Sequence, residues 1–324
     1  YYYDDGVLHK LLGAMGDVLH ALPAVASLKR SMPKARLSWV IDPKWAPLIE
    51  SNPDVDETMR FDRRDWSSVR ALWSWLRREP FDVAVDFQGL IKSALIARAS
   101  GARVRVGRTK EQARESAAAW FYSTPVETRS DHVVDQNLEI AARAGADRIS
   151  REFPIPMGKP EGELPMGRFV LACPLAGWTS KQWPLEYYED VAAGLREDGC
   201  SLVLNGPAPA APALSAVRGA HVHTSGIDGL IDATRRAAAV LGLDSGPMHL
   251  AAALGKPGVA VFGPTDPARN GPYCGTFTVL RDAGAATTYE RGGEIAESMR
   301  AVRPSAAIEA LRVRISFHCE RTGA

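Results

Sequence analysis

Short apolar runs alternate with amphipathic segments along most of the chain. The segments between the runs carry apolar residues three and four positions apart, which is the period of a helix. Such regular alternation predicts parallel, doubly wound α/β sheets. The predicted strands cover residues 7–12, 36–41, 57–61, 81–87 and 103–106 in the first half, and residues 168–173, 201–204, 221–223, 238–243, 258–262 and 277–280 in the second.

A change in composition divides these strands into two groups. Residues 153–167 are rich in proline, glycine and methionine, as interdomain linkers often are. We therefore predict a first domain over residues 1–152 and a second over residues 168–302, followed by a helix and tail over residues 303–324. A length of 324 residues suits this division, since domains commonly hold about 150 residues.

Charge and cysteine content exclude several classes of protein. The net charge of +1 gives no general attraction to nucleic acid. The four cysteines are scattered without a CxxC pair, which argues against a zinc site or a disulfide framework and suits a reducing cytosol. No apolar run approaches the roughly 20 residues of a membrane span, and no signal peptide is visible. His221 and His223 are two apart, but no third ligand is near, so we expect a plain strand and no metal site.

A glycine-bearing break follows the predicted strand over residues 238–243. It begins Asp244-Ser-Gly-Pro, and Pro247 suits the first turn of a helix. A helix that begins at the carboxyl end of a parallel strand presents free N–H groups to a phosphate. A tight turn in an ordinary α/β domain explains these residues equally well.

Two other turns carry candidate chemical groups. Gly13-Ala-Met-Gly-Asp17 leads into a helix that either begins or bends at Pro23, and Asp17 taken alone is best explained as a helix cap. Lys181 lies in a loop after the predicted strand over residues 168–173. It could reach a diphosphate as a point charge, although a surface lysine is the simpler interpretation.

Further polar residues lie near the same predicted sheet edge as Asp17. Gln88 and Lys92 follow the strand over residues 81–87, and Arg114 falls on a predicted helix over residues 109–122. Arg63 and Arg64 stand at the start of another predicted helix, where basic groups mildly oppose the helix dipole.

Tryptophans cluster on that last helix. For Trp66, Trp73 and Trp75 we favour packing inside the domain over an amphipathic membrane anchor.

Several motifs together resemble one family. Asp244-Ser-Gly-Pro-Met-His249 and Phe262-Gly-Pro-Thr-Asp-Pro267 resemble the donor-site motifs of the bacterial lipopolysaccharide heptosyltransferases, glycosyltransferase family 9. The similarity extends to Gly13-Ala-Met-Gly-Asp-Val-Leu-His-Ala-Leu-Pro23, Asp86-Phe-Gln-Gly-Leu-Ile-Lys-Ser93 and Lys181-Gln-Trp-Pro184. The resemblance implies a GT-B fold, in which two Rossmann-like domains face each other across a cleft.

The resemblance also implies an activity. Heptose would move from ADP-L-glycero-D-manno-heptose to the Kdo–lipid A inner core, without metal or cofactor. Asp17 matches the catalytic base of the family, and Lys181 would balance the negative charge on the diphosphate. A single base without a partnered nucleophile indicates direct displacement, which inverts the configuration at the anomeric carbon. The enzyme would be cytoplasmic, with peripheral contact to the inner membrane through its acceptor. Donor-binding positions are Thr179, Ser180, Lys181, Asp244, Ser245, Gly246 and His249; acceptor-binding positions are Gly16, Arg63, Arg64, Gln88, Lys92 and Arg114.

One departure from the family pattern leaves alternatives open. Ala208 and its neighbours follow Asn205-Gly-Pro, where family members often carry an acidic residue that could meet the ribose. A GT-B transferase or epimerase that uses another nucleotide sugar, or a non-catalytic nucleotide-sugar-binding protein, is therefore the alternative. A nicotinamide dehydrogenase is disfavoured, since Gly13-Ala-Met-Gly lacks the full G-x-G-x-x-G pattern.

Overall fold

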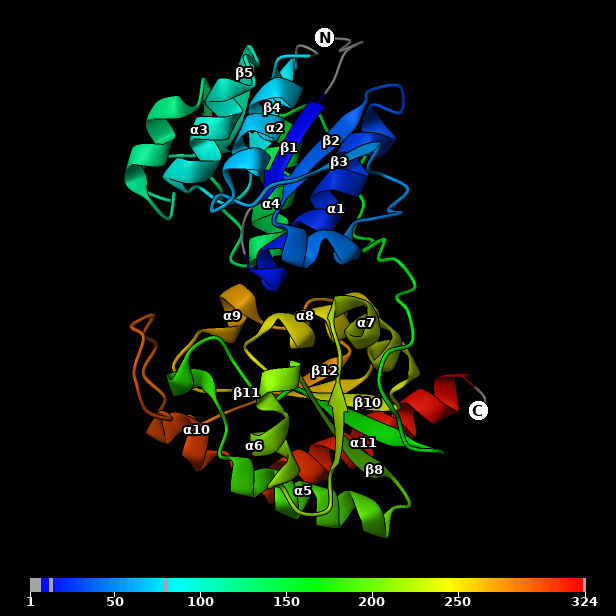
Figure 1. The fold of residues 1–324 in the computed structure, drawn as a ribbon. Coiled ribbons are helices and arrows are strands. Elements are labelled where there is room, and N and C mark those ends of the chain that lie inside the picture. The colour runs from blue at the N-terminus through cyan, green and yellow to red at the C-terminus, as the bar shows by residue number, and fades with distance from the viewer. Residues whose placement is uncertain (1–6, 12–13, 79–80, 323–324) are drawn as a thin grey trace. The chain divides into compact units, whose positions relative to one another are not determined.

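Two six-stranded sheets, one in each half of the chain, form the framework of the molecule (Figure 1). The structure, a computed structural model, describes residues 7–11, 14–78 and 81–322. The chain divides into two compact units, Tyr1–Pro156 and Met157–Ala324, with the boundary inside the predicted linker. Gly13 of the first glycine-bearing motif lies outside the described residues.

The first sheet has the strand order β3-β2-β1-β4-β5-β6, and all of its pairs are parallel. Leu8 of β1 lies opposite Ser38 of β2 and Ala84 of β4. β2 and β4 are buried along their whole length because helices cover both faces of a parallel sheet. The elements are β1 (Val7–Leu11), α1 (Met15–Ser31), β2 (Leu37–Ile41), η1 (Pro43–Leu48), β3 (Glu57–Arg60), α2 (Trp66–Leu76), β4 (Val83–Asp86), α3 (Ile91–Ala99), β5 (Val104–Arg108), η2 (Ser116–Phe121), β6 (Thr124–Val126) and α4 (Val133–Arg143).

The second sheet repeats this winding, with the order β12-β11-β10-β7-β8-β9 and parallel pairs throughout. Each sheet therefore reverses its strand order once, between β1 and β4 and between β7 and β10, and ligands bind α/β folds at such switch points. The elements are β7 (Phe169–Ala172), η3 (Thr179–Lys181), α5 (Leu185–Glu197), β8 (Ser201–Gly206), η4 (Ala208–Ala210), α6 (Ala211–Ser215), β9 (His221–Thr224), α7 (Ile227–Arg236), β10 (Ala239–Leu243), α8 (Gly246–Ala253), β11 (Gly258–Phe262), α9 (Pro267–Asn270), β12 (Phe277–Arg281), α10 (Glu297–Ala301) and α11 (Pro304–Thr322).

Three helices differ from the sequence-based expectation. α1 begins at Met15 and continues through Pro23, whose carbonyl oxygen accepts a 2.7 Å hydrogen bond from Ser27 Oγ. The predicted helix over residues 109–122 was wrong: the chain turns there and forms only the short η2. α11 runs on to Thr322 and packs against α5 in the second unit. Within the described residues, no helix is long and apolar enough to cross a membrane.

The predicted linker contains no helix or strand, but its second part is bound to the second unit. The N–H of Lys159 donates to the Asp228 carbonyl oxygen at 3.2 Å. The Glu161 carbonyl oxygen lies 2.6 Å from His223 Nε2. His223 is buried, and its other ring nitrogen lies 2.9 Å from Asn205 Nδ2, so this histidine serves packing.

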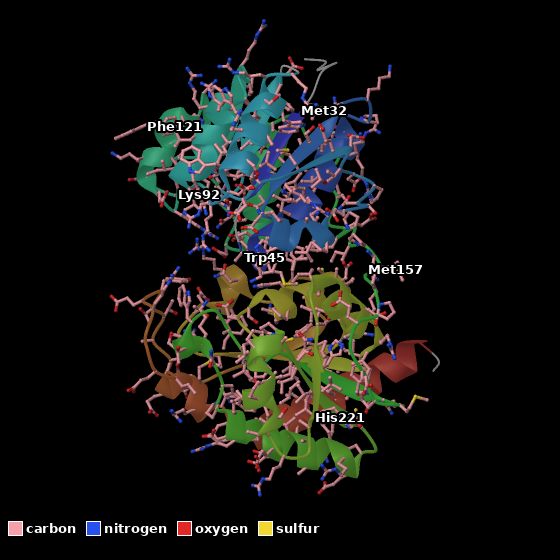
Figure 2. All side chains as sticks on the ribbon, in the orientation of Figure 1. Met32, Trp45, Lys92, Phe121, Met157 and His221 are labelled. Atoms are coloured by element: carbon pink, nitrogen blue, oxygen red, sulfur yellow. The ribbon has the colours of Figure 1, made fainter. Side chains whose placement is uncertain are left out.

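His221, which is labelled in Figure 2, also lies on β9, and the strand predicted there is confirmed. In the part of the chain that the structure describes, no group of three or more His, Cys, Asp or Glu side chains could hold a metal ion.

Candidate active site

In the first unit, Asp17 is held by hydrogen bonds from three sides. Arg114 donates to both carboxylate oxygens, from Nη2 to Oδ1 at 2.6 Å and from Nη1 to Oδ2 at 3.1 Å. Gln88 Nε2 and the Ala14 N–H also donate to Oδ2, at 3.3 and 3.2 Å. Asp17 therefore reaches back to the start of α1 from the third helical position, while Ala14 occupies the N-cap.

Arg114 reaches Asp17 because its loop lies close against the turn after β4. Gly89 in that turn has φ +67°, and a Cβ there would lie 3.1 Å from the Ala113 Cα. The Gly89 carbonyl oxygen accepts a 3.0 Å hydrogen bond from the Glu115 N–H. A glycine is required for both reasons, since it adopts positive φ freely and leaves room for the neighbouring backbone.

Asp86 fixes the same turn from inside. Its Oδ1 accepts from the N–H groups of Gln88, at 2.9 Å, and Gly89, at 3.3 Å. Its Oδ2 accepts a 2.7 Å hydrogen bond from the Tyr122 hydroxyl. Burial, and then the charge of Asp86, raise the pKa of Tyr122 well above its ordinary value, so the hydroxyl stays a donor. Asp86 is thus a structural carboxylate that positions Gln88.

The other predicted acceptor residues lie elsewhere in the first unit. Gly16 is half-buried in the first turn of α1. Arg63 and Arg64 are exposed on the turn before α2, whose N-cap is Asp65. Lys92, labelled in Figure 2, is exposed in the first turn of α3. The structure brings Gln88 and Arg114, rather than Arg63 or Arg64, into the hydrogen-bonded cluster around Asp17.

In the second unit, Lys181 and Asp244 meet at the switch point between β7 and β10. Lys181 Nζ donates to Asp244 Oδ2 at 2.5 Å, and Thr265 Oγ1 donates to the same oxygen at 2.7 Å. His249 Nε2 lies 3.8 Å from Asp244 Oδ1. The side chains of Lys181 and Asp244 are only 13% and 8% exposed, so solvent screens the pair weakly.

The charge state of Asp244 follows from these neighbours. Burial by itself would raise the pKa of its carboxyl. The His249 imidazole and the Lys181 ammonium act in the opposite direction and more strongly, so the pKa lies well below its usual range. Asp244 is therefore an ionised carboxylate that faces a lysine of opposite charge.

The loop that carries Lys181 is anchored at several points. Trp183 is buried and its Nε1 donates to the Val302 carbonyl oxygen at 2.9 Å. The Ser180 carbonyl oxygen accepts from the Ala296 N–H at 3.3 Å. Lys181 Nζ also lies 4.1 Å from the centre of the Trp178 ring, a cation–π contact. These contacts limit the positions that the ammonium group can take.

Two further features lie next to Lys181 and Asp244 in the chain, Ser180 and the start of α8. Ser180 Oγ is buried and has no hydrogen-bond partner among the described residues, which is costly for a hydroxyl. Ser245 is the N-cap of α8, but no side chain caps that helix end. Pro247 has no N–H and the Met248 N–H donates to the Ser245 carbonyl oxygen at 3.2 Å, so Gly246 supplies the N–H at this helix start that suits an anion. Thr179 is exposed on the same loop as Ser180.

Two contributions to this site were not predicted from the sequence. Thr265 lies in the motif Phe262-Gly-Pro-Thr-Asp-Pro267, and Trp178 lies three residues before Lys181, but neither received a role. The position of Thr265 within a donor-site motif could have indicated that it belongs to the site. The stacking of Trp178 depends on the course of the loop, which no local pattern encodes.

Comparison with known proteins identifies the family of this chain. The family model of glycosyltransferase family 9 (heptosyltransferase) matches residues 69–294. Lipopolysaccharide heptosyltransferase 1 of Pseudomonas aeruginosa PAO1 is 28% identical over 289 residues, covering 80% of this chain and 79% of that protein. The Escherichia coli K12 enzyme of the same name is 28% identical over 288 residues, covering 80% and 88%.

Solved structures show the same fold. The E. coli heptosyltransferase WaaC with ADP has a TM-score of 0.75 at 23% identity, covering 95% of this chain and 99% of its own. E. coli ADP-heptose lipopolysaccharide heptosyltransferase II has a TM-score of 0.77 at 21% identity, covering 97% and 99%. With two Rossmann-like domains of the GT-B fold and a family match across most of its length, this chain belongs to the heptosyltransferases of glycosyltransferase family 9.

Proposed function

We propose that this enzyme transfers heptose from ADP-L-glycero-D-manno-heptose to the Kdo–lipid A inner core, with inversion and without a metal. Its family supports heptose transfer in lipopolysaccharide synthesis. Structural neighbours include the E. coli enzyme WaaC with ADP and with ADP-2-deoxy-2-fluoro heptose, which supports an ADP-linked donor here.

The observation that carries the proposal is the Lys181–Asp244 pair beside the uncapped start of α8. An ammonium group has three N–H donors, and Asp244 takes one of them. We assign the other donors of Lys181, together with the N–H of Gly246, to the donor diphosphate. These positive groups would stabilise the negative charge that grows on the leaving ADP.

In this proposal Asp244 acts mainly by positioning Lys181. Its Oδ2 already accepts from Lys181 and Thr265, and His249 lies beside Oδ1. A carboxylate oxygen without partners that faced the donor phosphates would repel them. The carboxylate of Asp244 is instead surrounded by Lys181, Thr265 and His249, so it positions the lysine while its negative charge is balanced.

Asp17 supplies the base in the first unit. Its Oδ2 accepts three hydrogen bonds, from Ala14, Gln88 and Arg114, whereas Oδ1 accepts one, from Arg114. Each carboxylate oxygen has two lone pairs, so Oδ1 retains a site for the proton of the acceptor hydroxyl. General-base catalysis by Asp17 Oδ1, with direct displacement at the anomeric carbon, inverts the configuration.

Calorimetric titration with ADP, UDP and NAD, without added metal, tests the donor assignment. We expect binding of ADP in preference to UDP and NAD, and loss of that binding in Lys181→Ala. Preference for UDP would replace the proposed donor by another nucleotide sugar. Binding of NAD, or of none of the three, would overturn the donor site.

A further inference from the structure

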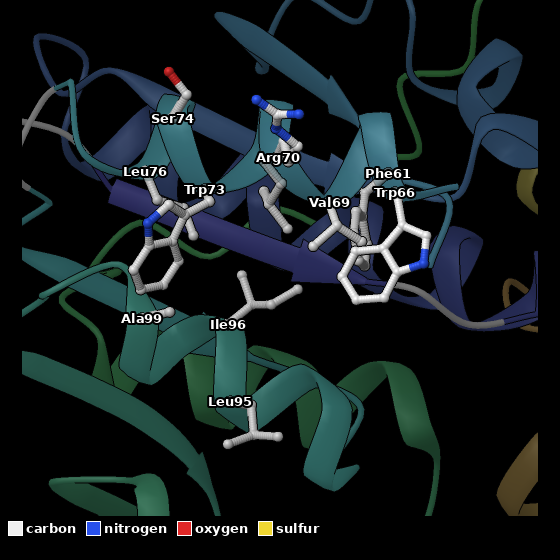
Figure 3. A pocket seen from close by; sticks show the side chains of 11 residues that line it. Phe61, Trp66, Val69, Arg70, Trp73, Ser74, Leu76, Leu95, Ile96 and Ala99 are labelled. Atoms are coloured by element: carbon white, nitrogen blue, oxygen red, sulfur yellow. The ribbon is translucent and has the colours of Figure 1, made fainter. Parts of the chain in front are cut away.

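An apolar groove runs between α2 and α3 in the first unit (Figure 3), and Asp17, Gln88 and Arg114 are not among the residues that line it. Its volume is about 520 Å³. Trp66 and Trp73 of α2 lie at its two ends, with Val69 and Ile96 between them and Leu95 on the α3 side.

The side chains around this groove are unusually exposed for their type. Trp66 is 81% exposed, Trp73 49% and Leu95 48%. The packing role predicted for these tryptophans was therefore wrong for Trp66 and Trp73, and it holds for Trp75, which is buried. Clustered large apolar side chains at a surface generally mark a site of interaction with another molecule or a membrane.

The charged residues within the two helices that form the groove are all basic, whereas the exposed Asp65 lies at the N-cap of α2. The charged residues within α2 and α3 are Arg70, Lys92 and Arg98, and neither helix contains an acidic residue. Arg77 follows α2, and its guanidinium carbon lies 4.5 Å from the centre of the Trp73 ring. The apolar groove thus has a predominantly basic border, which is complementary to an anionic surface.

We propose that the α2–α3 groove docks on a lipid bilayer that carries anionic headgroups. Tryptophan prefers the membrane–water interface, where its ring is apolar and its N–H remains hydrated. Arginines and lysines beside it gain from the negative surface potential of anionic lipids. An amphipathic surface with these two components is typical of peripheral membrane contact, and the proposal requires neither the donor site nor the transfer reaction.

Co-sedimentation of the full chain with lipid vesicles tests this proposal. We expect binding to vesicles that mix phosphatidylglycerol with phosphatidylcholine, weakening with salt, and much weaker binding to phosphatidylcholine alone. Trp66→Ala/Trp73→Ala removes the two exposed rings and should lower the partition coefficient by roughly tenfold or more. No binding to the anionic vesicles, or unchanged binding by this variant, overturns the proposal.

Two further variants make the test specific. Arg70→Gln/Arg77→Gln keeps the exposed tryptophans and should lower binding to anionic vesicles by roughly fivefold for each charge. If the tryptophan variant fails to fold, this pair decides the question alone. Trp120→Ala is the matched control, since Trp120 is 76% exposed but does not line the groove. A loss in Trp120→Ala as large as that in the tryptophan pair overturns the assignment to the groove.

Two parallel measurements separate this proposal from its rivals. Light scattering without vesicles reports self-association. Suppose that the wild type forms a dimer and does not bind vesicles, and that Trp66→Ala/Trp73→Ala is a monomer. This result would place a second copy of the chain over the groove and overturn the proposal. ADP titration of the same variants reports on the donor site. Vesicle binding without ADP binding supports the groove and contradicts only the proposed function.

Discussion

Lys181 and Asp244 form an almost buried ion pair, with 2.5 Å between Nζ and Oδ2, that joins the loop after β7 to the end of β10. Such a pair is expensive to desolvate and still more expensive to break, because the remaining charge then lacks its partner. The pair lies at a sheet switch point, beside the uncapped start of α8, and we propose that it binds the donor as well as contributing to stability.

Removal of the lysine should therefore affect two properties. Lys181→Ala leaves Asp244 buried without its ammonium partner, which should lower the free energy of unfolding by roughly 3 kcal/mol. ADP binding should be lost as well. Urea unfolding and calorimetry measure the two effects. Arg269→Ala is the control, since Arg269 is exposed on α9. If Lys181→Ala were as stable as this control and bound ADP as tightly, the prediction would be contradicted.

The depressed pKa of Asp244 predicts a particular dependence of stability on pH. Its folded-state pKa lies below the ordinary value of 3.8, so ionised Asp244 contributes stability that is fully present well above pH 3.8 and is lost as the pH falls through the folded-state pKa. The wild type should exceed Asp244→Asn in unfolding free energy by a constant amount between about pH 6 and 8, and the gap should narrow below about pH 4. Urea unfolding at a series of pH values measures the gap, and a gap that widens on acidification would contradict the sign of the shift.

The cluster around Asp17 predicts a loss of turnover with donor binding retained. Asp17→Asn keeps the shape of the side chain but removes its basicity, which should lower kcat by about 10²- to 10⁴-fold. Arg114→Gln should lower kcat by a smaller factor because it only releases the carboxylate from its fixed position. Initial rates and ADP titration separate the two properties. Normal turnover in Asp17→Asn would eliminate Asp17 as the base.

Substitution of Gly89 should affect activity more than stability. Gly89→Ala introduces a side chain at φ +67° and 3.1 Å from the Ala113 backbone, so Arg114 should move away from Asp17. Gly101→Ala is the matched control, with φ +76° but no atom within 4 Å of the added Cβ. Both should cost roughly 1–2 kcal/mol of stability from backbone strain. Only Gly89→Ala should greatly lower kcat, and equal rates in the two variants would show that the close contact has no catalytic role.

Eleven of the twelve strands in the described residues were predicted from the sequence because parallel strands are mostly short, buried and apolar; the three-residue β6 (Thr124–Val126) was missed. The run over residues 258–262 coincides with β11, and the break at Asp244 falls directly after β10. The same logic placed candidate residues at the strand ends, where a parallel sheet presents them together. Whether those residues bind donor and acceptor stays a prediction.

Long-range contacts account for what the sequence did not reveal. Residues 109–115 form turns instead of a helix because the Gln112 side chain is bonded to the backbone of Thr128. Its Nε2 donates to the Thr128 carbonyl oxygen at 2.7 Å, and its Oε1 accepts from the Thr128 N–H at 2.8 Å. The contact between Arg114 and Asp17 spans 97 positions. Helical spacing placed Trp66 and Trp73 on α2, but periodicity cannot show that no other element covers them. These features depend on tertiary packing, which local sequence patterns do not reveal.

The most direct test of the central claim is the reaction itself. Purified enzyme is incubated with ADP-L-glycero-D-manno-heptose and Kdo–lipid A, without added metal, and the products are identified by mass spectrometry with Asp17→Asn in parallel. We expect that the wild type adds one heptose to the acceptor and releases ADP, and that Asp17→Asn does so far more slowly. An unmodified acceptor with wild-type enzyme that is folded and binds ADP would contradict this expectation.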